Sequence, residues 1–303
     1  MGISRIEELH FGVEDIGECI RFFGDFGLSE PRRTGGVVTY TTPVGQTLFL
    51  HDILDPSLPP AVEEGSTIRE IIWGVDDESA LKAIAEDLAT DREVTVDADG
   101  TVHTVDESGF AVGLRLTRPT GAELWHREAN STGHERRWNE PLKRLGRAHP
   151  FRMCHVALFI RLDGWEQAVA FYTDRLGFRV TDQLLDMGTF MQAAEDQDQH
   201  TLLLAHRADK LAINHIAYEV ANFDEVVEGG NHMVASGWKE ARRTGRHTIG
   251  SNVFRFFHAP CGGRVEYAAD MDRVDRSYGP NIYEERPPHH MWMLTTNGQK
   301  EEL

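Results

Sequence analysis

The sequence predicts an α+β protein made of four βαβββ modules, which pair into two barrel-like domains. Three observations support this prediction. A strand–helix–strands pattern starts four times along the chain, and the two halves match each other at a constant offset. The length of 303 residues also suits two domains, because one domain usually contains about 100–200 residues.

The first module of each half opens on an alternating apolar run with a histidine at its centre. Residues 6–15 contain His10 and residues 152–160 contain His155, and such alternation is typical of a strand. A short amphipathic segment follows in each half and ends at a glycine, which suits the C-terminal cap of a helix. These segments are residues 20–28 and 169–178.

The second module of each half opens in a parallel way. Residues 68–76 match residues 213–220, so that Glu70 takes the place of His215. Subtracting 10 from 155 and 70 from 215 gives 145 in both cases, and two independent matches at one offset indicate an internal duplication. We expect the four modules to start near Arg5, Thr67, Met153 and Leu211.

Shifts in composition suggest the domain boundaries. We predict a first domain over residues 1–130, a linker over 131–150, a second domain over 151–275 and a tail over 276–303. The linker is polar and aperiodic and contains two prolines, as is typical of an exposed connection. The tail is rich in proline, asparagine and charge, and Trp292 is positioned to anchor it to the second domain.

Charge and cysteine content exclude several classes of function. The formal net charge of -18 disfavours nucleic acids and anionic membranes as partners. No apolar run approaches the ~20 residues of a membrane span, and the N-terminal residues lack an apolar signal core. The three cysteines are widely spaced, which predicts neither disulfides nor a structural zinc site. We expect a cytoplasmic protein with no nucleic-acid or membrane partner.

Three potential metal ligands occupy matching positions in the second half. His155 and His215 lie in the first strands of the third and fourth modules, and Glu266 starts the last strand after a glycine-rich turn. If these modules pair, both imidazoles point into a shared cavity with the carboxylate beside them. Two histidines and one carboxylate on one face leave positions open for other ligands, as in non-haem Fe(II) oxygenases. The alternative is that each histidine is an ordinary packed or surface residue.

Several motifs of the second half resemble those of a known family. Residues 245–254, the Pro-x-Gly-Gly-x-Val-Glu-Tyr run of residues 260–267 and the strand of residues 214–220 resemble type I extradiol ring-cleaving dioxygenases. These enzymes, catechol 2,3- and 2,3-dihydroxybiphenyl 1,2-dioxygenases, belong to the vicinal oxygen chelate superfamily, which has a glyoxalase/bleomycin-resistance-like fold. The resemblance extends over nearly the whole chain, with its motifs concentrated in the second half.

The resemblance implies an activity in aromatic hydrocarbon catabolism. It implies extradiol (meta) cleavage of a catechol-type ring by O2, at Fe(II) or alternatively Mn(II), held by His155, His215 and Glu266. The partners would be a small aromatic diol and O2, and the family often forms homo-oligomers. Sequence features do not identify which catechol is used.

The resemblance also implies catalytic and substrate-binding residues beside the metal. His200 matches a histidine that faces bound oxygen and shuttles a proton, and His247 matches one that hydrogen-bonds the ionised catechol oxygen. We expect Asn252 and Phe190 to contact the substrate as well. The alternatives are an exposed His200 after an acidic loop and a His247 that merely occupies a turn.

One position departs from the family pattern. Phe256 stands where a tyrosine is usual, nine residues after His247, and it cannot hydrogen-bond a substrate oxygen. His258 lies two residues further on the same face of the strand, which makes it a candidate catalytic replacement. An apolar substrate wall or ordinary core is expected from Leu184, Met187, Phe190 and Met191.

The first half contains a degenerate version of the ligand set. His10 and Glu70 match the two histidines, and Glu123 matches Glu266 only after a two-residue deletion is allowed. Since the family's first domain is typically without metal, we expect none there. Three other functions stay open: a 4-hydroxyphenylpyruvate-dioxygenase-like oxygenase, a glyoxalase-like enzyme, and a non-catalytic protein that binds an aromatic ligand.

Overall fold

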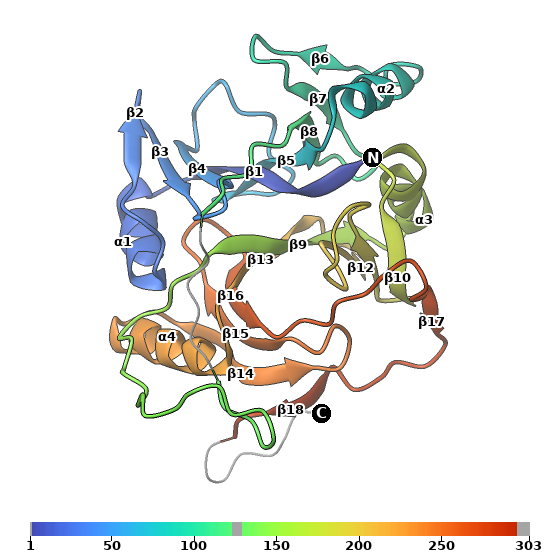
Figure 1. The fold of residues 1–303 in the computed structure, drawn as a ribbon. Helices are drawn as coiled ribbons and strands as arrows, with labels where there is room; N and C mark the ends of the chain where they lie inside the picture. The colour runs from blue at the N-terminus through green and yellow to red at the C-terminus, as the bar shows by residue number, and fades with distance from the viewer. Residues whose placement is uncertain (1, 123–128, 296–303) are drawn as a thin grey trace.

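The chain forms two mixed β-sheets that meet along their central strands, with helices at the periphery (Figure 1). This computed structural model describes residues 2–122 and 129–295. The predicted α+β class and the plan of four βαβββ modules are confirmed. None of the described helices is long and apolar enough to cross a membrane.

The first sheet contains two modules. The first module is β1 (Ile3–Val13), α1 (Ile16–Phe26), β2 (Arg32–Thr34), β3 (Val37–Thr41) and β4 (Thr47–Asp52). The second module is β5 (Thr67–Val75), α2 (Glu78–Leu88), β6 (Thr95–Val96), β7 (Val102–Val105) and β8 (Ala111–Leu116). The strand order is β2-β3-β4-β1-β5-β8-β7-β6.

The second sheet repeats this plan and adds two strands. The third module is β9 (Arg152–Arg161), α3 (Trp165–Ala170) with its π-helical extension η1 (Phe171–Arg175), β10 (Arg179–Leu184), β11 (Gly188–Gln192) and β12 (Leu202–Arg207). The fourth module is β13 (Ala212–Glu219), α4 (Phe223–Ala235), β14 (Glu240–His247), β15 (Val253–His258) and β16 (Arg264–Ala269). The added strands are β17 (Asn281–Tyr283) and β18 (His290–Met293).

The described part of the predicted tail is integrated into the second sheet. β17 pairs with β10 at one edge, and β18 pairs with β14 at the other. The order of the sheet is therefore β17-β10-β11-β12-β9-β13-β16-β15-β14-β18. Residues after the predicted second domain thus complete its sheet, which alternation within the modules alone did not indicate.

Local sequence explains where α1 begins and ends. The Asp15 side chain accepts a hydrogen bond from the backbone N–H of Glu18 (2.8 Å), which caps the first turn. Gly27 ends the helix with φ 103°, and a Cβ there would lie 2.0 Å from the carbonyl oxygen of Ala148. Glycine is required by both the left-handed backbone and this close approach, so the predicted glycine cap is confirmed.

The register of the central strands places the predicted ligands on one face. His155 in β9 lies opposite Ala217 in β13, and Ala217 lies opposite Glu266 in β16. The three residues therefore form a row across the sheet. His215 lies two residues before Ala217, so its side chain shares that face because side chains alternate along a strand.

Polar contacts lock the two sheets together near this row. Gln46 Nε2 donates to the carbonyl oxygen of Met153 (2.8 Å), and Met153 N–H donates to Gln46 Oε1 (2.6 Å). The Tyr267 hydroxyl donates to the carbonyl oxygen of Phe26 (2.7 Å), and the rings of these two residues stack at 4.0 Å. The strands that support the site are thereby braced by the first domain.

Candidate metal centre

The three predicted ligands converge on one point beneath a pocket. His155 Nε2 lies 3.0 Å from His215 Nε2 and 3.2 Å from Glu266 Oε2, and His215 Nε2 lies 3.3 Å from the same oxygen. All three side chains are buried. The sheet register brings them together from β9, β13 and β16, so the expected convergence is present.

The spacing and protonation of these groups fit a divalent metal ion. Donors at right angles about 2.1 Å from one ion are about 3 Å apart, close to the separations observed. Burial lowers the pKa of His155 to about 3 and that of His215 well below its usual range, so both imidazoles are neutral. Burial raises the pKa of Glu266 to about 8, and a bound cation would displace that proton.

Asparagine side chains orient two of the three donors. Asn214 Oδ1 accepts from His215 Nδ1 (3.0 Å), which leaves Nε2 of that ring facing the other donors. Arg264 also donates to Asn214 Oδ1. Asn252 Nδ2 donates to Glu266 Oε1 (3.0 Å). Asn252 was expected to contact substrate, but it is buried on Glu266 and does not line the pocket.

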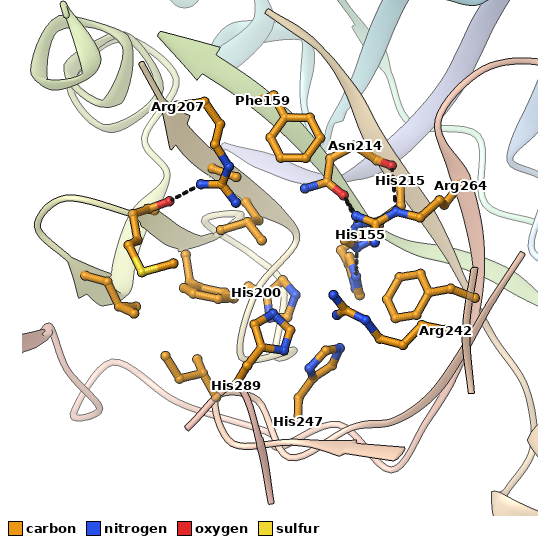
Figure 2. Close-up of a pocket in the computed structure, with 18 of the residues that line it drawn as sticks. His155, Phe159, His200, Arg207, Asn214, His215, Arg242, His247, Arg264 and His289 are labelled. Carbon is orange, nitrogen blue, oxygen red and sulfur yellow. Dashed lines mark hydrogen bonds between the residues drawn. The ribbon is translucent and has the colours of Figure 1, made fainter. Parts of the chain in front are cut away.

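The pocket above the donors has a volume of about 520 Å³ (Figure 2). Leu184, Met187 and Phe190 line it, as the apolar-wall interpretation expected. Met191 does not line it and is instead fully buried in the hydrophobic core. The difference follows from alternation along β11, which sends Phe190 and Met191 to opposite faces.

His200 lies in this pocket and is held in one orientation. Its ring centroid is 4.3 Å from that of His155 and 5.1 Å from that of Phe190. His200 Nδ1 donates to Gln199 Oε1 (2.6 Å), and Gln199 Nε2 donates in turn to the buried carboxylate of Asp182. The proton on Nδ1 leaves Nε2 of His200 with a free lone pair.

Asp182 also connects this arrangement to the tail. Its carboxylate accepts from the Tyr283 hydroxyl (3.0 Å), the Tyr278 hydroxyl (3.2 Å) and Asn281 Nδ2 (3.2 Å). The sequence analysis missed both Gln199 and Asp182. Gln199 stands directly before a predicted catalytic histidine, which is a usable signal, whereas nothing local distinguishes Asp182 within β10.

His247 lies at the end of β14, beside the proposed donors. Its ring stacks on Phe254 at 4.0 Å, and its Nε2 is 3.9 Å from Glu266 Oε1. Two tail histidines approach it, with ring centroids 5.1 Å (His289) and 5.6 Å (His290) away. Residues 286–289 line the pocket together with His247, a contribution of the tail whose individual residues the sequence could not place.

Phe256 occupies the position where the family pattern has a tyrosine. Its buried ring is 5.1 Å from that of His215, and the guanidinium carbons of Arg264 and Arg242 lie 5.2 and 5.5 Å from its centroid. Two cations therefore flank the place of the missing phenol. His258 lines the same pocket from an exposed position, and its role as a catalytic replacement stays a prediction.

On the corresponding face of the first sheet, no third donor is found among the described residues. His10 lies opposite Glu70, but the strand position equivalent to Glu266 is occupied by Gly113 of β8, which lies opposite Ile72 of β5. The equivalence follows because Ile72 is two residues after Glu70, as Ala217 is two residues after His215. Glu123, the predicted counterpart, lies outside the described residues.

Residues 152–267 match the model of the Glyoxalase/Bleomycin resistance protein/Dioxygenase superfamily. The match covers most of the predicted second domain. Metapyrocatechase 2 of Cupriavidus necator is 36% identical to the chain over 128 residues, which are 42% of this chain and 39% of that protein. Biphenyl-2,3-diol 1,2-dioxygenase of Paraburkholderia xenovorans is 33% identical over 119 residues, 37% of this chain and 40% of that protein. These matches span about two fifths of the curated relatives.

Solved structures share the fold over nearly the whole chain. The 2,3-dioxygenase LapB of Pseudomonas sp. KL28 has a TM-score of 0.75 at 19% identity and covers 93% of this chain and 98% of its own. The Mn(II)-bound glyoxalase of Novosphingobium aromaticivorans has a TM-score of 0.69 at 19% identity and covers 98% of both chains. The expected vicinal oxygen chelate fold is thus confirmed. Since that glyoxalase carries a metal, the fold accommodates metal ions.

Proposed function

We propose that this protein is an Fe(II)-dependent extradiol dioxygenase that cleaves a catechol-type ring with O2. The observation that carries the proposal is the convergence of His155, His215 and Glu266, buried but open to a pocket on one side. Two imidazoles and one carboxylate are the ligand set typical of non-haem Fe(II) oxygenases, and Mn(II) is the alternative metal. The names of the curated relatives that match the second domain support the same chemistry.

A bound iron would supply Lewis acidity and a template on which a diol and O2 meet. The chain itself would position the diol and move protons. His247, whose Nε2 is 3.9 Å from Glu266 Oε1, would hold the ionised diol oxygen. His200, with its Nδ1 proton engaged by Gln199, offers Nε2 to accept and return a proton. The apolar wall of Leu184, Met187 and Phe190 would exclude water from the ring.

The test is oxygen consumption by the reconstituted protein. Protein loaded with Fe(II) without air is mixed with monocyclic and bicyclic catechols and then exposed to O2. We expect stoichiometric oxygen uptake and a yellow product that absorbs in the near-visible range. A parallel sample of the Glu266→Ala variant should show neither. If no catechol supports oxygen uptake by the iron-loaded protein, the proposal is wrong.

A glyoxalase-like activity is the second candidate, because the Mn(II)-bound glyoxalase resembles this chain over 98% of both chains. Such an enzyme would isomerise a hemithioacetal without oxygen. Mn(II)-loaded protein and the hemithioacetal of methylglyoxal and glutathione, mixed without air, therefore separate the two candidates. A 4-hydroxyphenylpyruvate-dioxygenase-like enzyme would instead consume O2 with a 2-oxo acid and release CO2. A binding protein would turn over none of these compounds.

Assembly into a homo-oligomer stays a prediction. Light scattering from the metal-loaded protein measures it directly.

A further inference from the structure

The pocket wall carries a concentration of positive charge that the proposed ring cleavage does not require. Five basic side chains line the pocket, and the described lining contains no aspartate or glutamate. The basic residues are Arg207, Lys210, Arg242, Arg264 and Arg286. The chain as a whole has a formal net charge of -18, so this cluster opposes the general charge of the molecule.

Four of these cations form two pairs, each arranged around an aromatic ring. Arg242 and Arg264 flank Phe256 on the side of the proposed metal donors. Arg207 and Lys210 flank Phe159, at 5.1 and 4.2 Å from its ring centroid. Figure 2 shows Arg207 across the pocket from His247 and Arg242. A diol held beside His200 and His247 would therefore direct its substituent along the apolar wall toward Arg207.

Arg207 and Lys210, the pair farther from the metal donors, have no acidic partner within the described part of the chain. Arg207 donates to the carbonyl oxygens of Met187 (3.4 Å) and His206 (2.5 Å), which are uncharged acceptors. Among the residues that the structure describes, no carboxylate forms an ion pair with Arg207 or Lys210. Burial, followed by the charge of Arg286, lowers the pKa of Arg207, as expected where cations face one another. An anion placed there would relieve this repulsion.

We propose that the substrate is a catechol with an anionic side chain, and that Arg207 and Lys210 bind its carboxylate. This inference rests on the proposed extradiol activity for the diol end of the ligand. It adds the chemical class of the substituent and assigns specificity to two residues away from the metal. The apolar wall between the two ends suits a short alkyl or aryl spacer.

The first test compares charged and neutral substrates of equal size. The probes are 3-(2,3-dihydroxyphenyl)propionate, its 3,4-dihydroxy isomer and their methyl esters, assayed with the Fe(II)-loaded enzyme. We expect kcat/KM for one acid to exceed that of its ester by about 10- to 100-fold, as is typical of a lost charged hydrogen bond. Added salt should lower kcat/KM for the acid and leave that of the ester unchanged.

The second test assigns the preference to residues. The double variant Arg207→Met, Lys210→Met should reduce the acid-to-ester ratio to near one, through a higher KM for the acid. Arg161→Met is the matched control, because Arg161 pairs with Arg207 across β9 and β12 but is exposed outside the pocket. A double variant that keeps the full preference for the acid would exclude these two residues as the binding site.

A binding measurement separates this inference from the proposed activity. Metal-free protein is titrated calorimetrically with 3-phenylpropionate and with 3-phenylpropionamide, neither of which contains a diol. Tighter binding of the acid, lost in the double variant, supports the anion site even if no catechol is cleaved. Equal binding of both compounds, together with equal cleavage of acids and esters, would overturn the inference and leave the ring-cleavage proposal standing.

Discussion

The two sheets of this protein share one plan but use their matching positions differently. In the first sheet, the polar side chains at these positions hydrogen-bond to one another. His10 contacts Glu8 and His51, each at 3.3 Å, and Glu70 accepts from His103 at 2.7 Å. In the second sheet, His155, His215 and Glu266 face one another, and burial raises the pKa of the Glu266 carboxyl to about 8.

The comparison shows how small a difference separates a structural network from a candidate metal site. Gly113 offers no donor at the strand position equivalent to Glu266, and a Cβ there would lie 3.0 Å from the Ile72 side chain. Arg115 forms ion pairs with Glu8 and Asp99, which closes the network further. The duplicated scaffold supplies positions, and the side chains at three of them decide between mutual pairing and metal binding.

Removing the third donor should have the largest effect. Glu266→Ala deletes the only carboxylate of the set, and we expect metal content to fall from about one ion per chain to near zero. Glu70→Ala is the matched change in the first sheet and should leave metal content unchanged. Elemental analysis after anaerobic reconstitution with Fe(II) measures both. Stoichiometric iron in Glu266→Ala would show that the proposed donor set is incorrect.

Removing the proposed proton carrier should slow turnover and leave the metal in place. His200→Ala should lower kcat by about 10²- to 10⁴-fold, the usual contribution of a positioned acid–base group. His10→Ala, the histidine change in the first sheet, should leave kcat unaltered. Steady-state oxygen uptake compares them, with iron content as the control. An unchanged kcat in His200→Ala would remove this residue from the mechanism.

Metal affinity should depend on pH through the carboxylate of the second sheet. Because burial holds the pKa of Glu266 at about 8 without metal, binding below that pH must release its proton. Both imidazoles are already neutral, so we expect affinity to rise about tenfold per pH unit between pH 6 and 8 and then level off. Competition with a chelator measures this. Affinity that stays constant over the same interval would contradict the raised pKa.

Removing the hydrogen bond between His200 and Gln199 should have a smaller effect on kcat. Gln199→Ala frees the Nδ1 proton of His200, and we expect kcat to fall about 10-fold with metal content intact. Gln197→Ala is the control, since Gln197 is exposed in the same loop. Partial recovery of kcat in Gln199→Asn would indicate that an amide acceptor orients the ring. Equal rates for both alanine variants would assign Gln199 a purely structural role.

The smallest effect is expected in the first sheet. The hydrogen bond that His103 donates to the Glu70 carboxylate raises the pKa of His103. This pair therefore stabilises the fold below the unfolded pKa of about 6.5, and the stabilisation is lost as pH rises through the raised value. Glu70→Gln should therefore lower the free energy of unfolding by less than about 1 kcal/mol at pH 6. At pH 9 the decrease should be smaller than at pH 6. Urea unfolding at both pH values checks the sign, and turnover should not change.

Patterns along the chain predicted what depends on strands and their alternation. The four modules and the shared face of His155 and His215 follow from period-two patterning and from the duplication. Gly113 could not be recognised as the counterpart of Glu266, because the loops of the two halves differ in length. Asp182 and its partners at positions 278–283 are nearly 100 residues apart, and such contacts leave no local periodicity. The family motif also predicted a substrate contact for Asn252, but its side chain instead hydrogen-bonds Glu266.

The tail has a mechanical consequence for the second sheet. β17 and β18 lie at its opposite edges and are joined only by residues 284–289. A fully extended connection of that length spans about 25 Å at most. The tail therefore acts as a strap that limits how far the sheet can flatten. It also covers the outer edges of β10 and β14, which would otherwise offer unpaired backbone groups to other chains.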